Sequence, residues 1–127
     1  MSEPTATTAR PETEDDKVAR IRKEVEAANP GAEVWFGQHP KTKDWWLYRP
    51  ATRPEARIYR KKLAEEIGRG ELGDTERAYE VLYACVLYPP REEFLRLVER
   101  RPALPAIVAG EIWEVSGSTG DAVQKKL

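Results

Sequence analysis

The spacing of apolar residues changes twice along the chain, from helical to alternating and back to helical. Over residues 13–29 apolar side chains recur at intervals of three and four, as on one face of a helix. Thr13 precedes them as an N-cap, and Asp16 stands three residues later as the acid of a capping box. An Asn-Pro-Gly sequence at 29–31 ends the pattern, so we predict a helix over 13–29. Residues 1–12 are polar and aperiodic, which predicts a disordered tail.

Residues 33–49 carry aromatic and β-branched side chains in two short runs, which is typical of a β-hairpin. A turn-like stretch at 37–43 separates the two runs. Because a hairpin alone is marginally stable in water, we expect helices or a partner to cover one of its faces. Trp45 and Trp46 are neighbours on the second strand and are expected to point to opposite faces, one toward the helices and one outward.

From residue 50 onward the pattern is helical again, with breaks that divide residues 53–117 into about four helices. Thr52 and Glu55 form a second capping box at the start of the first of these helices. Glycines at 68 and 70 end this helix, and Asp74 is expected to cap the next one. The predicted inward positions of the first helix are Ala56, Tyr59, Leu63 and Ile67.

The second helix of this region, roughly 75–87, is apolar on almost all sides after its first turn, which predicts a buried, central position. Two prolines at 89–90 are expected to end it and to start a short third helix. The inward residues of that third helix are predicted to be Phe94, Leu95, Leu97 and Val98. A last helix is expected to start at Pro105, and its apolar set is Ile107, Val108, Ile112, Trp113 and Val115.

The predicted fold is therefore α+β and mainly helical, with an N-terminal helix, one β-hairpin and a bundle of about four helices. We expect the helix over 13–29, the hairpin over 33–49 and the bundle over 53–117 to form a single globular domain over 13–117. Residues 118–127 contain few apolar side chains and predict a flexible C-terminal tail.

The amino-acid composition argues against several classes of function and adds little about the fold. The 127 residues include 21 Lys and Arg against 22 Asp and Glu, a formal net charge of -1. This balance argues against a protein that binds nucleic acid or an anionic membrane surface through a basic surplus. The polar, acidic start predicts no signal peptide, and no apolar run approaches the roughly 20 residues of a membrane span. The cytoplasm is the expected compartment.

The sequence shows no motif for catalysis, for a metal or for a cofactor, so we predict a protein that is not an enzyme. Glycines at 68, 70 and 73 lack the strand and the Lys-Ser/Thr of a phosphate loop. His39, the only histidine, is expected in an exposed turn. Cys85, the only cysteine, lies among apolar residues of a predicted helix, which favours a buried and inert thiol. Paired carboxylates fall on neighbouring helix positions that diverge by roughly 100°.

Aromatic side chains are the candidate binding residues. If one face of the hairpin is exposed, its tryptophans provide an apolar surface for another protein. The alternative is that terminal segments cover that face, in which case the same residues belong to the core. The candidate partner-binding residues are Trp35, Trp45, Trp46, Tyr88 and Trp113.

Four short segments appear in an order seen in a known family. They are WLYRP at 46–50, TRPEAR at 52–57, ACVLYP at 84–89, and RPAL at 101–104 leading to IWEVSG at 112–117. In this order and spacing, residues from about 46 to 117 resemble the tail assembly chaperones of long-tailed bacteriophages. That family shows an Arg-Pro helix start after a hairpin, a helix that ends at Tyr-Pro, and a closing helix that ends in Ser-Gly.

The resemblance implies a small, mainly helical, non-enzymatic protein made in the cytoplasm of the infected or lysogenic host. Its expected partners are the tape measure protein, whose long helices such chaperones keep soluble, and the tail tube protein. Self-association is a further option, and neither nucleic acid nor membrane is an expected partner. Family members are generally absent from the finished virion, and many also exist as a longer product of ribosomal frameshifting.

Two other functions remain open from the sequence. A head–tail connector or tail-completion protein would bury the same aromatic residues permanently in the particle. A small DNA-binding regulator would use the helix over 75–87 and the one after it as a helix-turn-helix, although these helices are apolar and poor in arginine.

Overall fold

The computed structural model describes residues 11–70 and 75–117 of the chain. The predictions of a disordered segment over most of 1–12, of a cap at Asp74 and of a flexible tail at 118–127 lie outside the described residues. The chain divides into two compact units at the junction between Ala32 and Glu33. The single domain expected over 13–117 stays a prediction.

Within residues 11–32, the first unit contains the helix α2 (Glu14–Ala28), where the sequence predicts it. The Oγ1 of Thr13 accepts from the Asp16 N–H at 3.1 Å, and the Asp16 carboxylate accepts from the Thr13 N–H at 3.2 Å. This reciprocal capping box satisfies two of the N–H groups that every helix start leaves without an intrahelical partner. At the other end, the side-chain amide of Asn29 donates to the carbonyl of Val25 at 2.8 Å.

The second unit begins with an antiparallel hairpin of β1 (Trp35–Gln38) and β2 (Trp45–Tyr48). Gly37 and Gln38, expected in the turn, belong to the first strand instead, and Gly37 lies directly opposite Trp46. The turn is closed by the His39 N–H, which donates to the carbonyl of Asp44 at 2.8 Å. The imidazole of His39 accepts from backbone N–H groups within the same turn, so this histidine shapes the turn.

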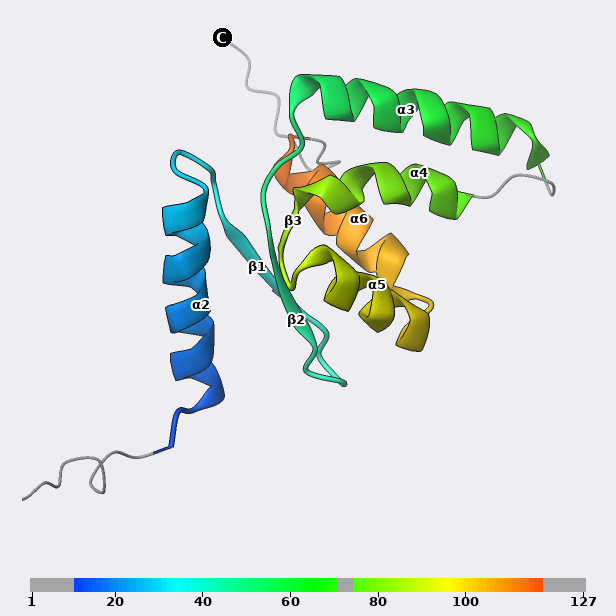
Figure 1. The fold of residues 1–127 in the computed structure, drawn as a ribbon. Coiled ribbons are helices and arrows are strands. Elements are labelled where there is room, and N and C mark those ends of the chain that lie inside the picture. The colour runs from blue at the N-terminus through cyan, green and yellow to red at the C-terminus, as the bar shows by residue number, and fades with distance from the viewer. Residues whose placement is uncertain (1–10, 71–74, 118–127) are drawn as a thin grey trace, which may run out of the picture. The chain divides into compact units, whose positions relative to one another are not determined.

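The prediction of one helix over 75–87 is wrong in its second half. The helix α4 (Thr75–Leu82) is followed by a short 3₁₀ turn, η2 (Tyr83–Cys85), and by a third strand, β3 (Val86–Tyr88). β3 pairs antiparallel with β2, which gives a three-stranded sheet in the order β1-β2-β3 (Figure 1). A short apolar run suits a buried helix and a buried strand equally well, and here the free edge of β2 supplies the strand's hydrogen-bond partners. The prolines at 89–90 therefore end a strand.

The described part of the second unit, residues 33–70 and 75–117, also contains the helices α3 (Arg53–Gly68), α5 (Arg91–Arg100) and α6 (Leu104–Val115). The predicted capping box of α3 is confirmed, with reciprocal hydrogen bonds between Thr52 and Glu55. Its predicted inward stripe is wrong at one end, because Ile67 is 64% exposed and Glu66 is buried. Glu66 lies seven residues after the buried Tyr59, close to two helical turns, whereas Ile67 is a further 100° around the axis. The expected inward Leu95 and Ile107 are also exposed.

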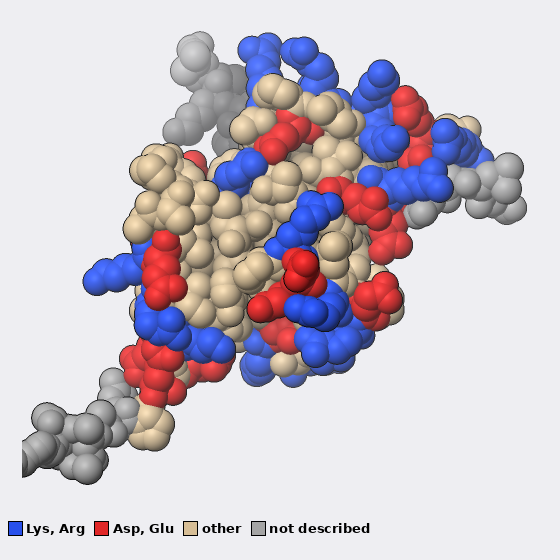
Figure 2. Space-filling model, in the orientation of Figure 1, with Lys and Arg blue, Asp and Glu red and all other residues tan. Residues whose placement is uncertain are grey.

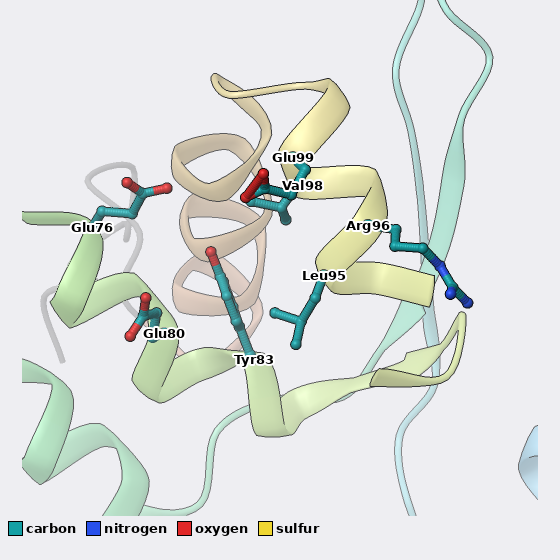
Figure 3. A pocket seen from close by; sticks show the side chains of 7 residues that line it. All are labelled: Glu76, Glu80, Tyr83, Leu95, Arg96, Val98 and Glu99. Atoms are coloured by element: carbon teal, nitrogen blue, oxygen red, sulfur yellow. The ribbon is translucent and has the colours of Figure 1, made fainter. Parts of the chain in front are cut away.

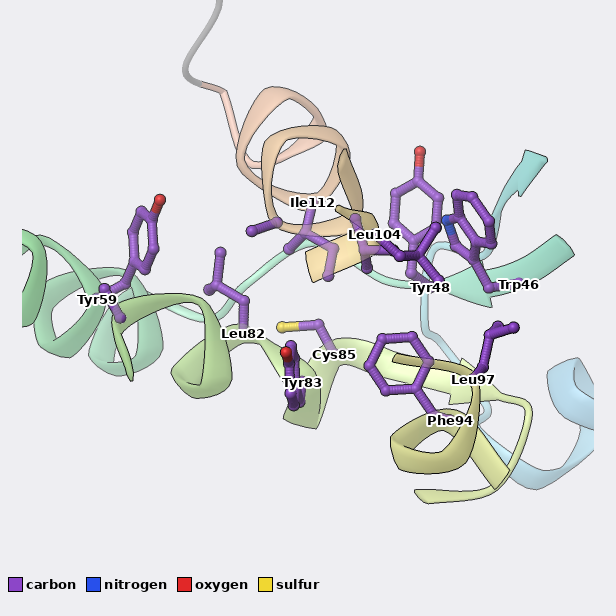
Figure 4. Packing of buried hydrophobic residues seen from close by; sticks show 13 residues of the cluster. Trp46, Tyr48, Tyr59, Leu82, Tyr83, Cys85, Phe94, Leu97, Leu104 and Ile112 are labelled. Atoms are coloured by element: carbon purple, nitrogen blue, oxygen red, sulfur yellow. The ribbon is translucent and has the colours of Figure 1, made fainter. Parts of the chain in front are cut away.

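The core of this unit combines one face of the sheet with all four helices (Figure 4). Tyr83 and Phe94 meet edge to face within it, with ring centroids 5.0 Å apart. Its buried members are Trp46, Tyr48, Tyr59, Ala78, Leu82, Tyr83, Cys85, Phe94, Leu97, Leu104, Val108, Ala109 and Ile112. The predicted class, a mainly helical α+β fold with one hairpin followed by helices, is confirmed, and β3 is the addition that the sequence did not indicate.

Candidate partner-binding surface

The five aromatic residues predicted to bind a partner lie in different environments. Trp35 is 42% exposed on the edge strand β1. Tyr88 and Trp113 are half-buried. Trp45 and Trp46 point to opposite faces of the sheet and both are buried, so neither of them faces solvent. Trp35 is thus the most exposed of the five predicted residues.

Trp46 is a core residue whose indole N–H makes a hydrogen bond. Its side chain is 0% exposed, and its indole N–H donates to the Oε1 of Glu111 on α6 at 2.7 Å. Burial raises the pKa of Glu111, the Trp46 N–H opposes that rise, and the nearby Glu114 adds to it. Gly37 makes room for this pair, because a Cβ at that position would collide with both the indole nitrogen and the carboxylate. Trp46 therefore joins the sheet to α6.

Trp45 belongs to an aromatic row that crosses the sheet on its other face. Its ring stacks on Phe36 of β1 with centroids 5.9 Å apart, and on Tyr88 of β3 with centroids 4.8 Å apart. Such cross-strand aromatic pairs stabilise a sheet. Trp113 has a similar role on α6, where it packs against Tyr59 of α3 with centroids 4.8 Å apart. These contacts account for the burial of Trp45 and Trp113 in structural terms.

The exposed part of the hairpin is the pair Trp35 and Phe36, which we call the β1 edge. Phe36 is 39% exposed, and the Trp35 indole N–H donates to the carboxylate of Glu33 at 2.8 Å. Within the described residues β1 pairs with β2 alone, so its second side has no strand partner. Two neighbouring aromatic side chains that face water on an edge strand are a candidate contact for another protein.

A second candidate surface is a groove between α4 and α5, which the sequence did not indicate. Its volume is about 460 Å³. Tyr83 and Leu95 line its floor with Val98, and Figure 3 shows the Tyr83 ring rising between the two helices. Its remaining lining residues are Glu76, Glu80, Arg96 and Glu99.

The groove lining carries more acidic than basic side chains, with Glu76, Glu80 and Glu99 against Arg96. Burial raises the pKa of the Tyr83 hydroxyl to about 12, and the charges of Glu76 and Glu80 add to the rise. Arg96 is the basic lining residue, and its side chain points away from Tyr83 and the glutamates (Figure 3). A sequence signal for the groove does exist, since Glu76 and Glu80 are four residues apart on α4, and Leu95 and Val98 are three apart on α5. These spacings indicate the groove only once α4 and α5 are known to line it together.

A polar cluster joins the end of β2 to the start of α3. The guanidinium of Arg49 binds both carboxylate oxygens of Glu55, at 2.8 and 3.0 Å, and also donates to the carbonyl of Ala84 at 3.3 Å. The hydrogen bond from Arg49 lowers the pKa of Glu55 to about 2. The Cys85 thiol lies 3.6 Å from this carboxylate, and burial, reinforced by the negative charge of Glu55, raises the pKa of Cys85 to about 12. A thiol held in its neutral form is a poor nucleophile.

Among residues 11–70 and 75–117, no three His, Cys, Asp or Glu side chains gather closely enough to hold a metal ion. In the same part of the chain, no helix combines the length and apolarity needed to cross a membrane. Comparison with protein-family models, with curated proteins and with solved structures finds no match for the chain.

Proposed function

We propose that this protein is a non-enzymatic tail assembly chaperone of a long-tailed bacteriophage. In this proposal it acts in the cytoplasm of the bacterial host, where it binds the tape measure protein and tail tube subunits before they assemble. It leaves the tail before the virion is complete. A chaperone of this kind needs an exposed apolar contact on a charged surface that keeps the free protein soluble.

The observation that carries the proposal is the β1 edge. Trp35 and Phe36 keep 42% and 39% of their side chains exposed, although the neighbouring Trp45 and Trp46 are buried. Aromatic residues that stay exposed beside a well-packed core are typical of binding hot spots. Because consecutive strand residues point to opposite faces of a sheet, the two rings lie on either side of the free edge of β1, and an apolar partner segment lying along that edge would contact both. The sequence resemblance, which begins at Trp46 on the neighbouring strand β2, suggests the identity of that partner.

The test is co-expression with the tape measure protein of the same phage. We expect the tape measure protein to be insoluble alone, and to become soluble and co-purify when this chain is present. A double variant, Trp35→Ala with Phe36→Ala, is expected to remain folded and to lose the co-purification. Ile67→Ala is the matched control, because Ile67 is also an exposed large apolar residue but lies on α3.

Two results would oppose the proposal. If the tape measure protein stays insoluble while this chain is soluble and alone, the chaperone function loses its support. If the chain is instead found in stoichiometric amounts in purified virions, it is a connector or tail-completion protein. The co-expression experiment measures the first result, and mass spectrometry of purified particles measures the second.

A further inference from the structure

Tyr83 is the residue of the α4–α5 groove whose polar group the packing of the chain leaves unused. Its side chain is 6% exposed, and its ring packs edge to face on Phe94 in the core. Its hydroxyl points into the groove, between the glutamates of α4 and Glu99 of α5 (Figure 3). Within residues 11–70 and 75–117 this hydroxyl has no hydrogen-bond partner. Because buried hydroxyl groups normally have one, a molecule bound in the groove is the natural source of the missing hydrogen bond.

The charges around this hydroxyl favour a cation. Glu76, Glu80 and Glu99 line the groove, whereas Arg96 points away from them. Glu80 and Glu99 form no ion pair with another residue of the described chain. The phenol is neutral at pH 7, since burial and the nearby glutamates raise the pKa of Tyr83 to about 12. A neutral phenol oxygen accepts a hydrogen bond from an ammonium or guanidinium group, and the carboxylates balance the positive charge.

The floor beside the hydroxyl is apolar. Leu95 is 40% exposed there, and Val98 is half-buried next to it. Acidic and uncharged surface lie side by side over α4 and α5 in Figure 2. The groove volume, about 460 Å³, is enough for a few side chains of another molecule. A small free cation would leave Leu95 in water, so the groove fits a cation that belongs to a larger, partly apolar molecule.

We propose that the α4–α5 groove binds a basic amphipathic helix of another protein. One lysine or arginine of that helix donates to the Tyr83 hydroxyl between the glutamates, and the apolar stripe of the helix covers Leu95 and Val98. The methylene stem of the basic side chain also lies well on an apolar floor. The groove shares no residue with the β1 edge, and this inference stands independently of the proposed chaperone function.

The test measures the binding of two synthetic peptides to the full chain. The first is a labelled helical peptide of about 16 residues, with a leucine stripe flanked by lysines. The second has glutamate in place of every lysine. Fluorescence anisotropy is expected to show saturable binding of the lysine peptide and binding at least about tenfold weaker for the glutamate peptide. Binding of the lysine peptide is expected to weaken as salt is added, because salt screens exposed charges.

Two groove variants and one control locate the binding site. Tyr83→Phe keeps the ring and removes the hydroxyl, so it is expected to weaken binding of the lysine peptide at least about fivefold. The same variant is expected to leave the urea midpoint of the free chain unchanged, because no internal hydrogen bond is lost. Glu80→Gln with Glu99→Gln is expected to weaken binding at least about tenfold. The matched control is Glu92→Gln with Glu93→Gln, at exposed positions of α5 outside the groove lining, and it is expected to bind as the wild type does.

Several results would overturn the proposal. They are no saturable binding of the lysine peptide up to about 1 mM, equal binding of the two peptides, or full binding by Tyr83→Phe. Trp35→Ala with Phe36→Ala is expected to bind the lysine peptide normally, and if this variant alone loses binding, the peptide uses the β1 edge and the groove proposal is wrong. If the peptide-free chain instead self-associates in sedimentation and Tyr83→Phe prevents it, the groove is occupied by a second copy, which also contradicts the proposal.

Discussion

Gly37 provides the sharpest test of the packing described above. It faces Trp46 across the hairpin, and a Cβ at this position would meet the indole nitrogen of Trp46 and the carboxylate of Glu111. Neither group can move freely, because Trp46 is fully buried and its N–H is bound to Glu111 at 2.7 Å. Gly37→Ala must therefore displace the indole, the carboxylate or the strand.

The expected cost follows from two effects. Overpacking a tight interior site costs about 1–3 kcal/mol, and weakening a hydrogen bond to a charged group costs about 1.5–3 kcal/mol. Because the strand can relax part of the strain, we expect Gly37→Ala to lower the free energy of unfolding by about 2–4 kcal/mol in total. Gly110 is the matched control, since it lies inside α6 and nothing stands within 4 Å of a Cβ built there. Gly110→Ala is expected to raise stability by about 0.5–1 kcal/mol, because alanine loses less backbone entropy in a helix.

The assay is urea unfolding followed by circular dichroism and tryptophan fluorescence. The same chemical change, one added methyl group, is expected to have opposite signs at the two glycines. A Gly37→Ala variant as stable as the wild type would refute the close approach of Gly37 to the Trp46–Glu111 pair. A Gly110→Ala variant that is destabilised would show that α6 is more tightly surrounded than the structure indicates.

Three further predictions follow from buried groups. Trp46→Ala is expected to lower the free energy of unfolding, measured in urea, by about 3–5 kcal/mol. Trp35→Ala is expected to change it by less than about 1 kcal/mol. Equal losses would contradict the difference in burial between the two residues. Glu55 has its pKa lowered to about 2 from an ordinary 4.5, so its contribution to stability is complete above about pH 4.5 and is lost as the pH falls toward 2. Unfolding free energies measured between pH 7 and pH 2 should show this loss. In Glu55→Gln the unfolding free energy should change less with pH over this range, and an unchanged pH dependence would argue against the pair with Arg49. The Cys85 thiol is buried with its pKa raised to about 12, so iodoacetamide should label it slowly in the folded protein and quickly in urea, and fast labelling of the folded chain would show an accessible thiol.

The starts and ends of helices could be predicted from the sequence because their causes are local. Thr13 with Asp16 and Thr52 with Glu55 each satisfy backbone N–H groups within three residues, so their effect does not depend on the rest of the fold. The hairpin could be predicted for the same reason, from its aromatic and β-branched runs. The α+β class and the order of most elements follow from these signals.

The tertiary structure decided the features whose causes are distant in the chain. Residues 86–88 form a strand because β2 offers them hydrogen bonds from about 40 residues away, and no local pattern could reveal that edge. Both Trp45 and Trp46 are buried because β1, β3 and α6 supply their contacts. The candidate binding residues show the same difference between local and distant causes. The sequence by itself named the hairpin aromatics as candidate binding residues, and the packing of the sheet leaves Trp35 and Phe36 exposed while it buries Trp45 and Trp46.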